Sequence, residues 1–97
     1  MSMVVGTMKL TLRFFAVSSL KGKRSIVKKI VERSKNSFNA SVSETGLNDV
    51  LDRAEIGFAL CGNDSSMLNS KLDKLVNFVD DMGLAEITNV DMEIISL

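Results

Sequence analysis

Hydrophobic and polar residues alternate in several segments of the chain, as in β-strands that bury one face. From residue 8 to residue 14 every second side chain is apolar, and the side chains between them are Lys9, Thr11 and Arg13. Residues 53–61 alternate in the same way. Because successive side chains of a strand point to opposite faces, this period predicts strands at residues 3–14 and 53–61.

Two other segments have apolar residues at the spacing of a helix buried on one side. Residues 20–36 place Ile26, Val27, Ile30 and Val31 in one arc, with Ser18 and Ser19 available as N-caps. Residues 62–65 provide a turn and cap, and residues 66–82 carry a similar stripe, Leu68, Leu72, Leu75, Val76 and Val79, which Gly83 follows as a helix terminator. We therefore predict two amphipathic helices.

The remaining apolar segments complete the fold. Residues 38–42 and 84–95 read as further strands, and residues 44–52, which contain Gly46, Asn48 and two aspartates, read as a loop. The order is β-α-β-β-α-β, which predicts an α+β protein with a ferredoxin-like four-stranded antiparallel sheet and two helices on one face. At 97 residues we expect one domain, residues 1–97, with the other sheet face open.

Charge is distributed unevenly along a chain whose net charge is zero. Residues 1–48 carry nine Lys or Arg against two Asp or Glu, and residues 49–97 carry three against ten. Seven of the fifteen residues from Lys21 to Lys35 are basic, and Glu32 is the one acidic residue among them. Clustered cations favour phosphate-rich or acidic partners, so this helix is the first candidate for function.

The composition excludes several kinds of catalytic and metal-binding site. The sequence has no histidine and a single cysteine, Cys61, so serine or cysteine triads and His- or thiolate-based metal sites are excluded. We expect no catalytic residue, no cofactor and no metal, and we identify no small-molecule substrate. No segment is apolar enough to span a membrane and no secretory signal is evident, so a cytoplasmic location and no membrane partner are expected.

The basic helix has two interpretations. It is either a phosphate-binding surface or a solvated outer face, with Asp73, Asp80 and Asp81 of the second helix as candidate partners for surface ion pairs. In the first interpretation the side chains act as charges that neutralise phosphates, not as readers of bases. The residues predicted to bind RNA or phosphate are Lys21, Lys23, Arg24, Lys28, Lys29, Arg33 and Lys35.

The open sheet face is the other candidate surface. Phe15 is the only aromatic residue expected near it, so stacking of RNA bases, which related topologies achieve with aromatic residues on the central strands, is not predicted. Gly57 and Ala59 would leave a shallow surface there. Such a surface, or an exposed edge strand, suits self-association, and a homo-oligomeric structural or interaction protein is the alternative function.

Several short motifs, in their order and spacing, resemble the YlxP-like family of small bacterial proteins along nearly the whole chain. They are Ser19-Leu20-Lys21-x-Lys23-Arg24, Arg33, Phe38-Asn39-x-Ser41-Val42-x-Glu44, Arg53-Ala54-x-Ile56-Gly57, Asn63-Asp64 and Asp73-Lys74. The resemblance implies a ferredoxin-like fold, no established enzymatic activity, and a link to RNA or ribosomes. Residues and resemblance together predict a non-enzymatic accessory binding module whose first helix engages RNA, a ribosomal surface or an acidic protein.

Overall fold

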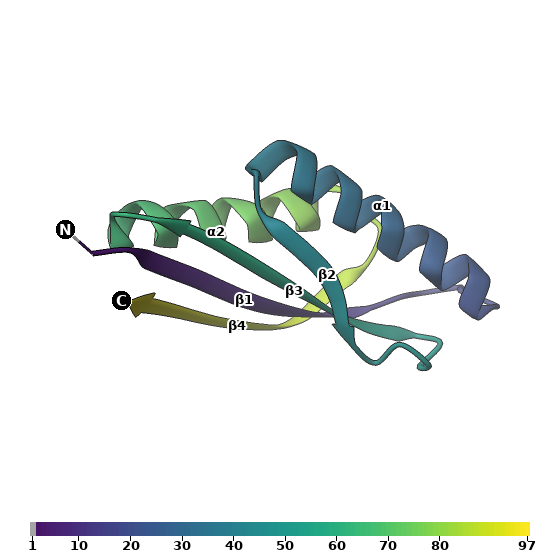
Figure 1. The fold of residues 1–97 in the computed structure, drawn as a ribbon. Coiled ribbons are helices and arrows are strands. Elements are labelled where there is room, and N and C mark those ends of the chain that lie inside the picture. Colours follow the sequence, from purple (N-terminus) through teal and green to yellow (C-terminus); the bar gives the residue numbers. More distant parts are fainter. Residues whose placement is uncertain (1) are drawn as a thin grey trace.

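A computed structural model describes residues 2–97 of the protein as one four-stranded antiparallel sheet with both helices on the same face (Figure 1). This arrangement confirms the predicted ferredoxin-like α+β fold. The elements follow in the order β1 (Val4–Arg13), α1 (Leu20–Phe38), β2 (Ser41–Gly46), β3 (Arg53–Gly62), α2 (Ser65–Asp81) and β4 (Glu86–Ser96).

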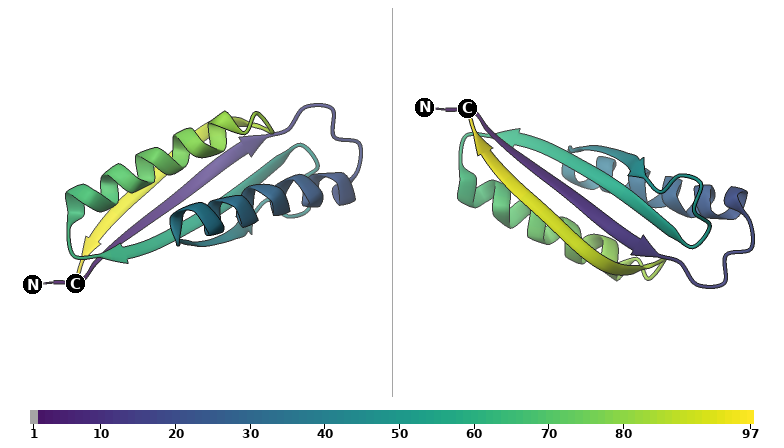
Figure 2. Two further views of the ribbon diagram at one scale, coloured as in Figure 1. Left: turned by 90° about the horizontal axis from the view of Figure 1, so that it is seen from above. Right: turned by 90° about the horizontal axis from the view of Figure 1, so that it is seen from below.

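The strands lie in the order β2-β3-β1-β4, so β1 and β3 form the centre of the sheet. Lys9 of β1 pairs with Gly57 of β3 on one side and with Asp91 of β4 on the other. The two ends of the described chain meet at one end of the sheet, where the Leu97 N–H donates to the Met3 carbonyl at 2.8 Å. The views from above and below show both helices on one side and the other sheet face uncovered (Figure 2).

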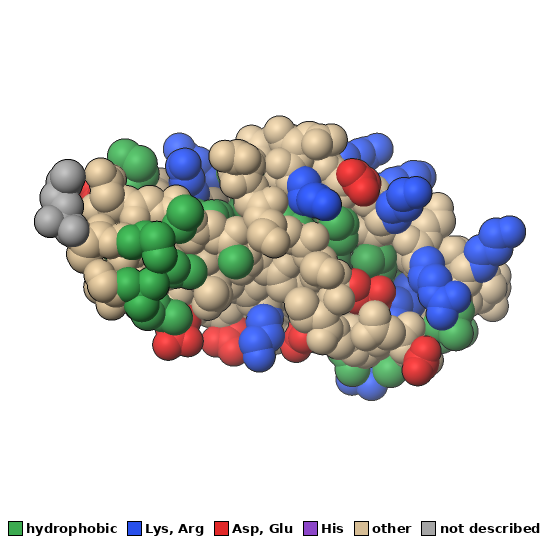
Figure 3. Space-filling model, in the orientation of Figure 1, with side chains coloured by type: hydrophobic (Ala, Val, Ile, Leu, Met, Phe, Trp, Pro, Cys, Tyr) green, Lys and Arg blue, Asp and Glu red, His purple; other side chains and the backbone are tan. Residues whose placement is uncertain are grey.

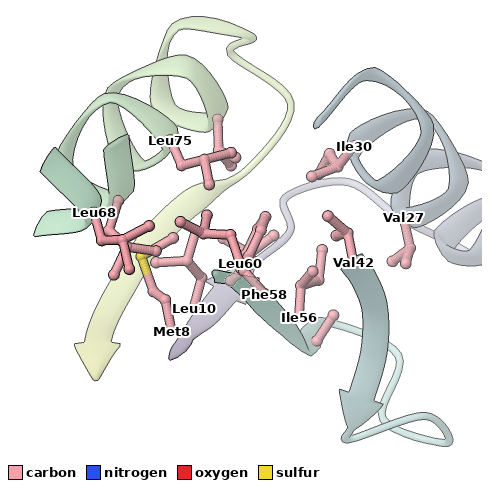
Figure 4. Close-up of a cluster of buried hydrophobic side chains, with 14 of the residues drawn as sticks. Met8, Leu10, Val27, Ile30, Val42, Ile56, Phe58, Leu60, Leu68 and Leu75 are labelled. Carbon is pink, nitrogen blue, oxygen red and sulfur yellow. The ribbon is translucent and has the colours of Figure 1, made fainter. Parts of the chain in front are cut away.

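The hydrophobic core fills the space between the sheet and the two helices (Figure 4). α2 packs on β1 and β4, while α1 lies over β2. The alternation seen in the sequence accounts for this core, since the inward residues of β3 are all buried, as are four of the five residues of the predicted stripe of α2. The largest fully buried apolar side chains are Met8, Leu10, Leu12, Ile30, Ile56, Leu72 and Leu75.

Both helices begin with side-chain caps. The Gly22 N–H donates to Ser19 Oγ at 3.0 Å, which confirms Ser19 as the N-cap of α1. Asp64 Oδ1 accepts from the N–H groups of Ser66 and Met67 at 2.9 and 3.2 Å at the start of α2. Gly83, with φ of 65°, follows the end of α2 in a conformation that suits glycine.

One strand begins later than the sequence pattern indicates. Phe38 ends α1 instead of opening a strand, and its ring packs against Phe78 of α2 with centroids 5.2 Å apart. Asn39 then takes a left-handed conformation with φ of 49°, which stops the helix. As a result β2 begins at Ser41 and includes Glu44, and the predicted loop is shortened to the residues after Gly46.

Candidate nucleic-acid interface

The candidate site is the outer side of α1, and the inner side of the helix determines which residues reach it. Val27, Ile30 and Ser34 are buried against the rest of the molecule. With 3.6 residues per turn, burial of this stripe turns the basic residues away from the core. The amphipathic pattern therefore fixes both the packing of α1 and the composition of its exposed surface.

Six of the seven predicted cations are exposed on α1. They are Lys21, Arg24, Lys28, Lys29, Arg33 and Lys35. In the space-filling view, Lys and Arg side chains gather over α1 (Figure 3). The structure thus places all six residues on the exposed part of α1.

Acidic residues of the same chain do not neutralise this surface. Within residues 2–97, ion pairs with nitrogen and oxygen no more than 4.0 Å apart are formed by Lys23 with Glu44 and by Arg53 with Asp52, and neither includes an exposed cation of α1. The ion pairs that the sequence allowed between the basic helix and Asp73, Asp80 and Asp81 of α2 are therefore not formed, and α1 presents a solvated basic face. The six ammonium and guanidinium groups are available to an external anion.

Lys23 corrects the sequence-based list of binding residues. Its side chain lies in the first turn of α1 but is completely buried, with 0% exposure. The Nζ group donates to the carbonyl oxygens of Leu47, Asn48 and Val50 at 2.7, 3.3 and 2.6 Å. A phosphate outside the protein cannot reach this ammonium group, so Lys23 is a structural residue.

The carbonyl groups that Lys23 binds all belong to the loop between β2 and β3. Leu47 in this loop has a φ of 59°, a conformation that costs a non-glycine residue about 1–2 kcal/mol. Glu44 of β2 places its Oε2 atom 3.5 Å from Lys23 Nζ, and this carboxylate oxygen is buried without a hydrogen bond of its own. Lys23 therefore joins the start of α1 to the end of β2 and to a strained loop.

Sequence reasoning did not identify Glu44 as the partner of Lys23. The available signal was the position of Lys23, which lies in the apolar arc of the helix and not on its charged side. A lysine at such a position must either extend to solvent or find acceptors inside the protein. Its acceptors are more than twenty residues away in the sequence, and only the folded chain brings them to it.

The open face of the sheet has a different chemical character. Lys9, Glu55, Asp91 and Glu93 are among the residues that line an open cavity of about 550 Å³ there. On this face the hydroxyl group of Thr45 donates a hydrogen bond to Glu55 Oε2 at 2.7 Å. A Cβ atom on Gly57 would lie 2.6 Å from Thr45 Cγ2, so glycine is required for this close approach.

Phe15 does not provide a base-stacking platform on this face. It lies beyond the end of β1, 61% exposed, and the guanidinium group of Arg13 sits 5.2 Å from the centre of its ring. Because strands of RNA-binding domains use aromatic residues in the middle of the sheet for stacking, this arrangement does not suit base recognition there. In Figure 3 several red side chains lie along the lower margin of the molecule, with a blue side chain among them.

Two absences within residues 2–97 bear on the site. None of the helices in this part of the chain has the length and apolar character needed to cross a membrane. No group of three or more Cys, Asp or Glu side chains in the same residues is arranged to hold a metal ion.

Fold and surface together define a small ferredoxin-like α+β protein with a cationic helix outside the sheet. Residues 5–92 match the family described as "Protein of unknown function (DUF503)", and the chain belongs to this family. It is also 33% identical over 66 residues to the "Uncharacterized protein YlxP" of Bacillus subtilis (strain 168), a match that covers 68% of this chain and 72% of that protein. These matches confirm the predicted YlxP-like relationship.

Solved structures of low sequence identity share the fold. The "Structural Genomics, protein YJCS" superimposes with a TM-score of 0.57 at 12% identity, over 92% of this chain and 96% of that one. The "De novo designed protein Foldit4" gives a TM-score of 0.51 at 15% identity, over 98% and 96% of the two chains. At these identities the likeness describes chain topology alone.

Proposed function

We propose that the protein is a non-enzymatic accessory module that binds RNA, free or on a ribosomal surface, through the phosphates along α1. The observation that carries this proposal is the set of six exposed cations on one helix, none of them paired with a carboxylate of residues 2–97. Phosphate oxygens would replace water and counterions around these groups. Lys23 takes no part in this binding, because its side chain is completely buried.

The positions of the charges along α1 support a role in binding a partner and not in stabilising the helix. Lys21 and Arg24 lie near the N-terminus of α1, and the first turn has no acidic residue. Cations near this end oppose the helix dipole, and the like charges Arg24 and Lys28, or Lys29 and Arg33, stand four residues apart, a spacing that destabilises a helix. These charges therefore weaken the helix that carries them, which is expected when they serve a partner.

The acidic part of the molecule would orient the partner. Asp91 and Glu93 lie on the open sheet face, and Asp73, Asp80 and Asp81 are exposed on α2. These carboxylates repel a phosphate backbone, whereas the outer side of α1 attracts it. RNA is therefore expected to approach from the side of α1.

A salt titration with single-stranded RNA tests the proposal. If about four to six phosphates are contacted, the logarithm of the association constant should fall with the logarithm of salt concentration with a slope of roughly −3 to −4. The double variant Lys28→Glu/Lys29→Glu should lose most of this binding. Lys71→Glu/Lys74→Glu is the matched control, because it makes the same change of charge with exposed lysines of α2.

Two results would contradict RNA binding by α1. One is a slope near zero for the unchanged protein, and the other is equal loss of binding in the two double variants. Circular dichroism should show native helix content for both variants, because all four lysines are exposed.

A second candidate function, self-association, is favoured by one end of the open sheet face. Val5, Cys61 and Ile95 lie side by side there, and Met3 and Leu97 are exposed beside them. An uncharged apolar patch of this kind can pack against its own copy. The centre of the face does not support complete face-to-face packing, since Lys9 shares it with three carboxylates and two copies would repel each other.

Molar mass in solution separates the two functions. Self-association through the apolar end predicts a dimer by light scattering that Ile95→Lys converts to a monomer, with RNA binding unchanged. A monomer at all concentrations tested would remove this candidate.

A further inference from the structure

The exposed cations of α1 fall into two rows, not one broad patch. At about 100° per residue, Arg24, Lys28 and Lys35 lie within about 40° of one another, whereas Lys29 and Arg33 lie about 140° away around the helix axis. All five side chains are exposed. A single strand would have to cross the helix to contact both rows.

The ridge between the two rows has a different composition. Apart from Lys21 it carries Ser25, Glu32 and Asn36, all exposed, and Glu32 is the only carboxylate on α1. A carboxylate in the middle of a phosphate-binding surface would repel the phosphates nearest to it. The same carboxylate is favourable if the ridge faces hydrogen-bond donors while the phosphates lie on either side of it.

From this arrangement, and resting on the function proposed above, we infer that α1 lies across a groove of double-helical RNA. One row of cations contacts the phosphates of one strand, the other row contacts those of the opposite strand, and the ridge faces the floor of the groove. With its side chains an α-helix is about 10–12 Å wide, so the two rows reach phosphate groups on the two sides of a groove.

The chemistry of the ridge favours RNA over DNA. The minor groove of an RNA duplex is wide and shallow and exposes a 2′-hydroxyl group, both donor and acceptor, on every nucleotide. Glu32 accepts hydrogen bonds from such groups, and Ser25 and Asn36 both donate and accept. Readout by shape and 2′-hydroxyl groups also needs no aromatic platform, which agrees with the absence of aromatic side chains from the described strands of the open sheet face.

The first experiment compares three probes of about 20 nucleotides and identical sequence: an RNA duplex, the single-stranded RNA and the DNA duplex. We expect the RNA duplex to bind at least about fivefold more tightly than either of the others at equal salt. Equal or tighter binding of the single strand would overturn the inference and leave the proposed function standing. Equal binding of the DNA duplex would overturn recognition of RNA through its 2′-hydroxyl groups. Salt-independent or undetectable binding of all three would overturn the proposed function itself.

A second experiment uses variants matched in charge, one for each row. Arg24→Gln/Lys35→Gln and Lys29→Gln/Arg33→Gln each remove two cations, and each should lower the steepness of the salt dependence on the RNA duplex by about two. If only one of the two variants has an effect, one row alone is used, and the inference is overturned.

The variant Glu32→Gln distinguishes two roles of the carboxylate. The affinity for the RNA duplex should fall if Glu32 accepts hydrogen bonds from the RNA, and rise if it only repels phosphates. If the ridge faces 2′-hydroxyl groups, loss of the carboxylate should weaken RNA duplex binding roughly three- to tenfold, as expected when a charged hydrogen bond is replaced by a neutral one. If Glu32 only repels nearby phosphates, the same variant should bind more tightly, and this result would overturn the inference. Asp73→Asn, a similar neutralisation on α2, measures the general effect of removing one negative charge.

Discussion

Basic side chains on the two sides of α1 have different surroundings and different roles. On the inner side, Lys23 is enclosed and donates to three loop carbonyl groups within 3.3 Å. On the outer side, six Lys and Arg residues are exposed, and no carboxylate of residues 2–97 lies within 4.0 Å of them. What separates them is the supply of acceptors inside the fold, because an ammonium group enters the interior only where oxygen atoms replace its water.

This contrast shows why a count of basic residues overstates a binding surface. Lys23 lies between Lys21 and Arg24 in the sequence, yet it contributes to the stability of the protein and not to its surface charge. The outer cations contribute little to stability, because exposed charges interact weakly across water. Mutations on the two sides should therefore separate folding from binding.

The largest effect is expected from Lys23→Met, which keeps most of the side-chain volume but removes the ammonium group. The Glu44 carboxylate and the loop carbonyl groups would lose their partner, and breaking a buried ion pair in this way lowers the free energy of unfolding by about 3–5 kcal/mol. Urea denaturation measures this change. The matched control Lys28→Met, on the outer side, should change the free energy by no more than about 0.5 kcal/mol. Equal effects of the two variants would remove the distinction between the two sides.

A smaller effect is expected from Glu44→Gln, which leaves Lys23 with its three carbonyl acceptors. The Glu44 contact is longer, at 3.5 Å, and the carboxylate side chain is 17% exposed, so we expect a loss of about 1–2 kcal/mol. Because the two residues are in contact, combining Glu44→Gln with Lys23→Met should cost less than the sum of the single changes, by about 0.5–3 kcal/mol. Simple additivity in urea denaturation would show that the pair is not coupled.

Local periodicity predicted the fold because most strands and helices bury one face of regular spacing. The residues expected to point inward from β3 are buried, and Ser19 caps α1 as expected. The boundary at Phe38 could not be predicted, since this residue fits the apolar face of a helix as well as the start of a strand. Its contact with Phe78, forty residues away, and the left-handed turn at Asn39 decide between the two.

The exposed part of the candidate site was also predictable, because six cations fall opposite the apolar arc of α1. The position of Lys23 in that arc indicated that it differs from the others, but its acceptors could not be found from sequence. They are backbone carbonyl groups, which every residue carries, and their availability depends on the path of the loop after β2. The amino-acid sequence therefore does not show which carbonyl groups will accept hydrogen bonds from a buried lysine.

The smallest effects concern the outer cations and the helix dipole, and two variants should differ in sign. Lys21→Glu replaces a cation with an anion in the first turn of α1 and should raise the free energy of unfolding by about 0.3–1 kcal/mol at low ionic strength. Lys35→Glu makes the same change in the last turn, where the dipole favours a cation, and should lower it by a similar amount. Thermal denaturation at low and at high salt measures both changes, and both should shrink as salt screens the charges. A destabilising effect of Lys21→Glu would instead show that Lys21, although exposed, contributes to the stability of the fold.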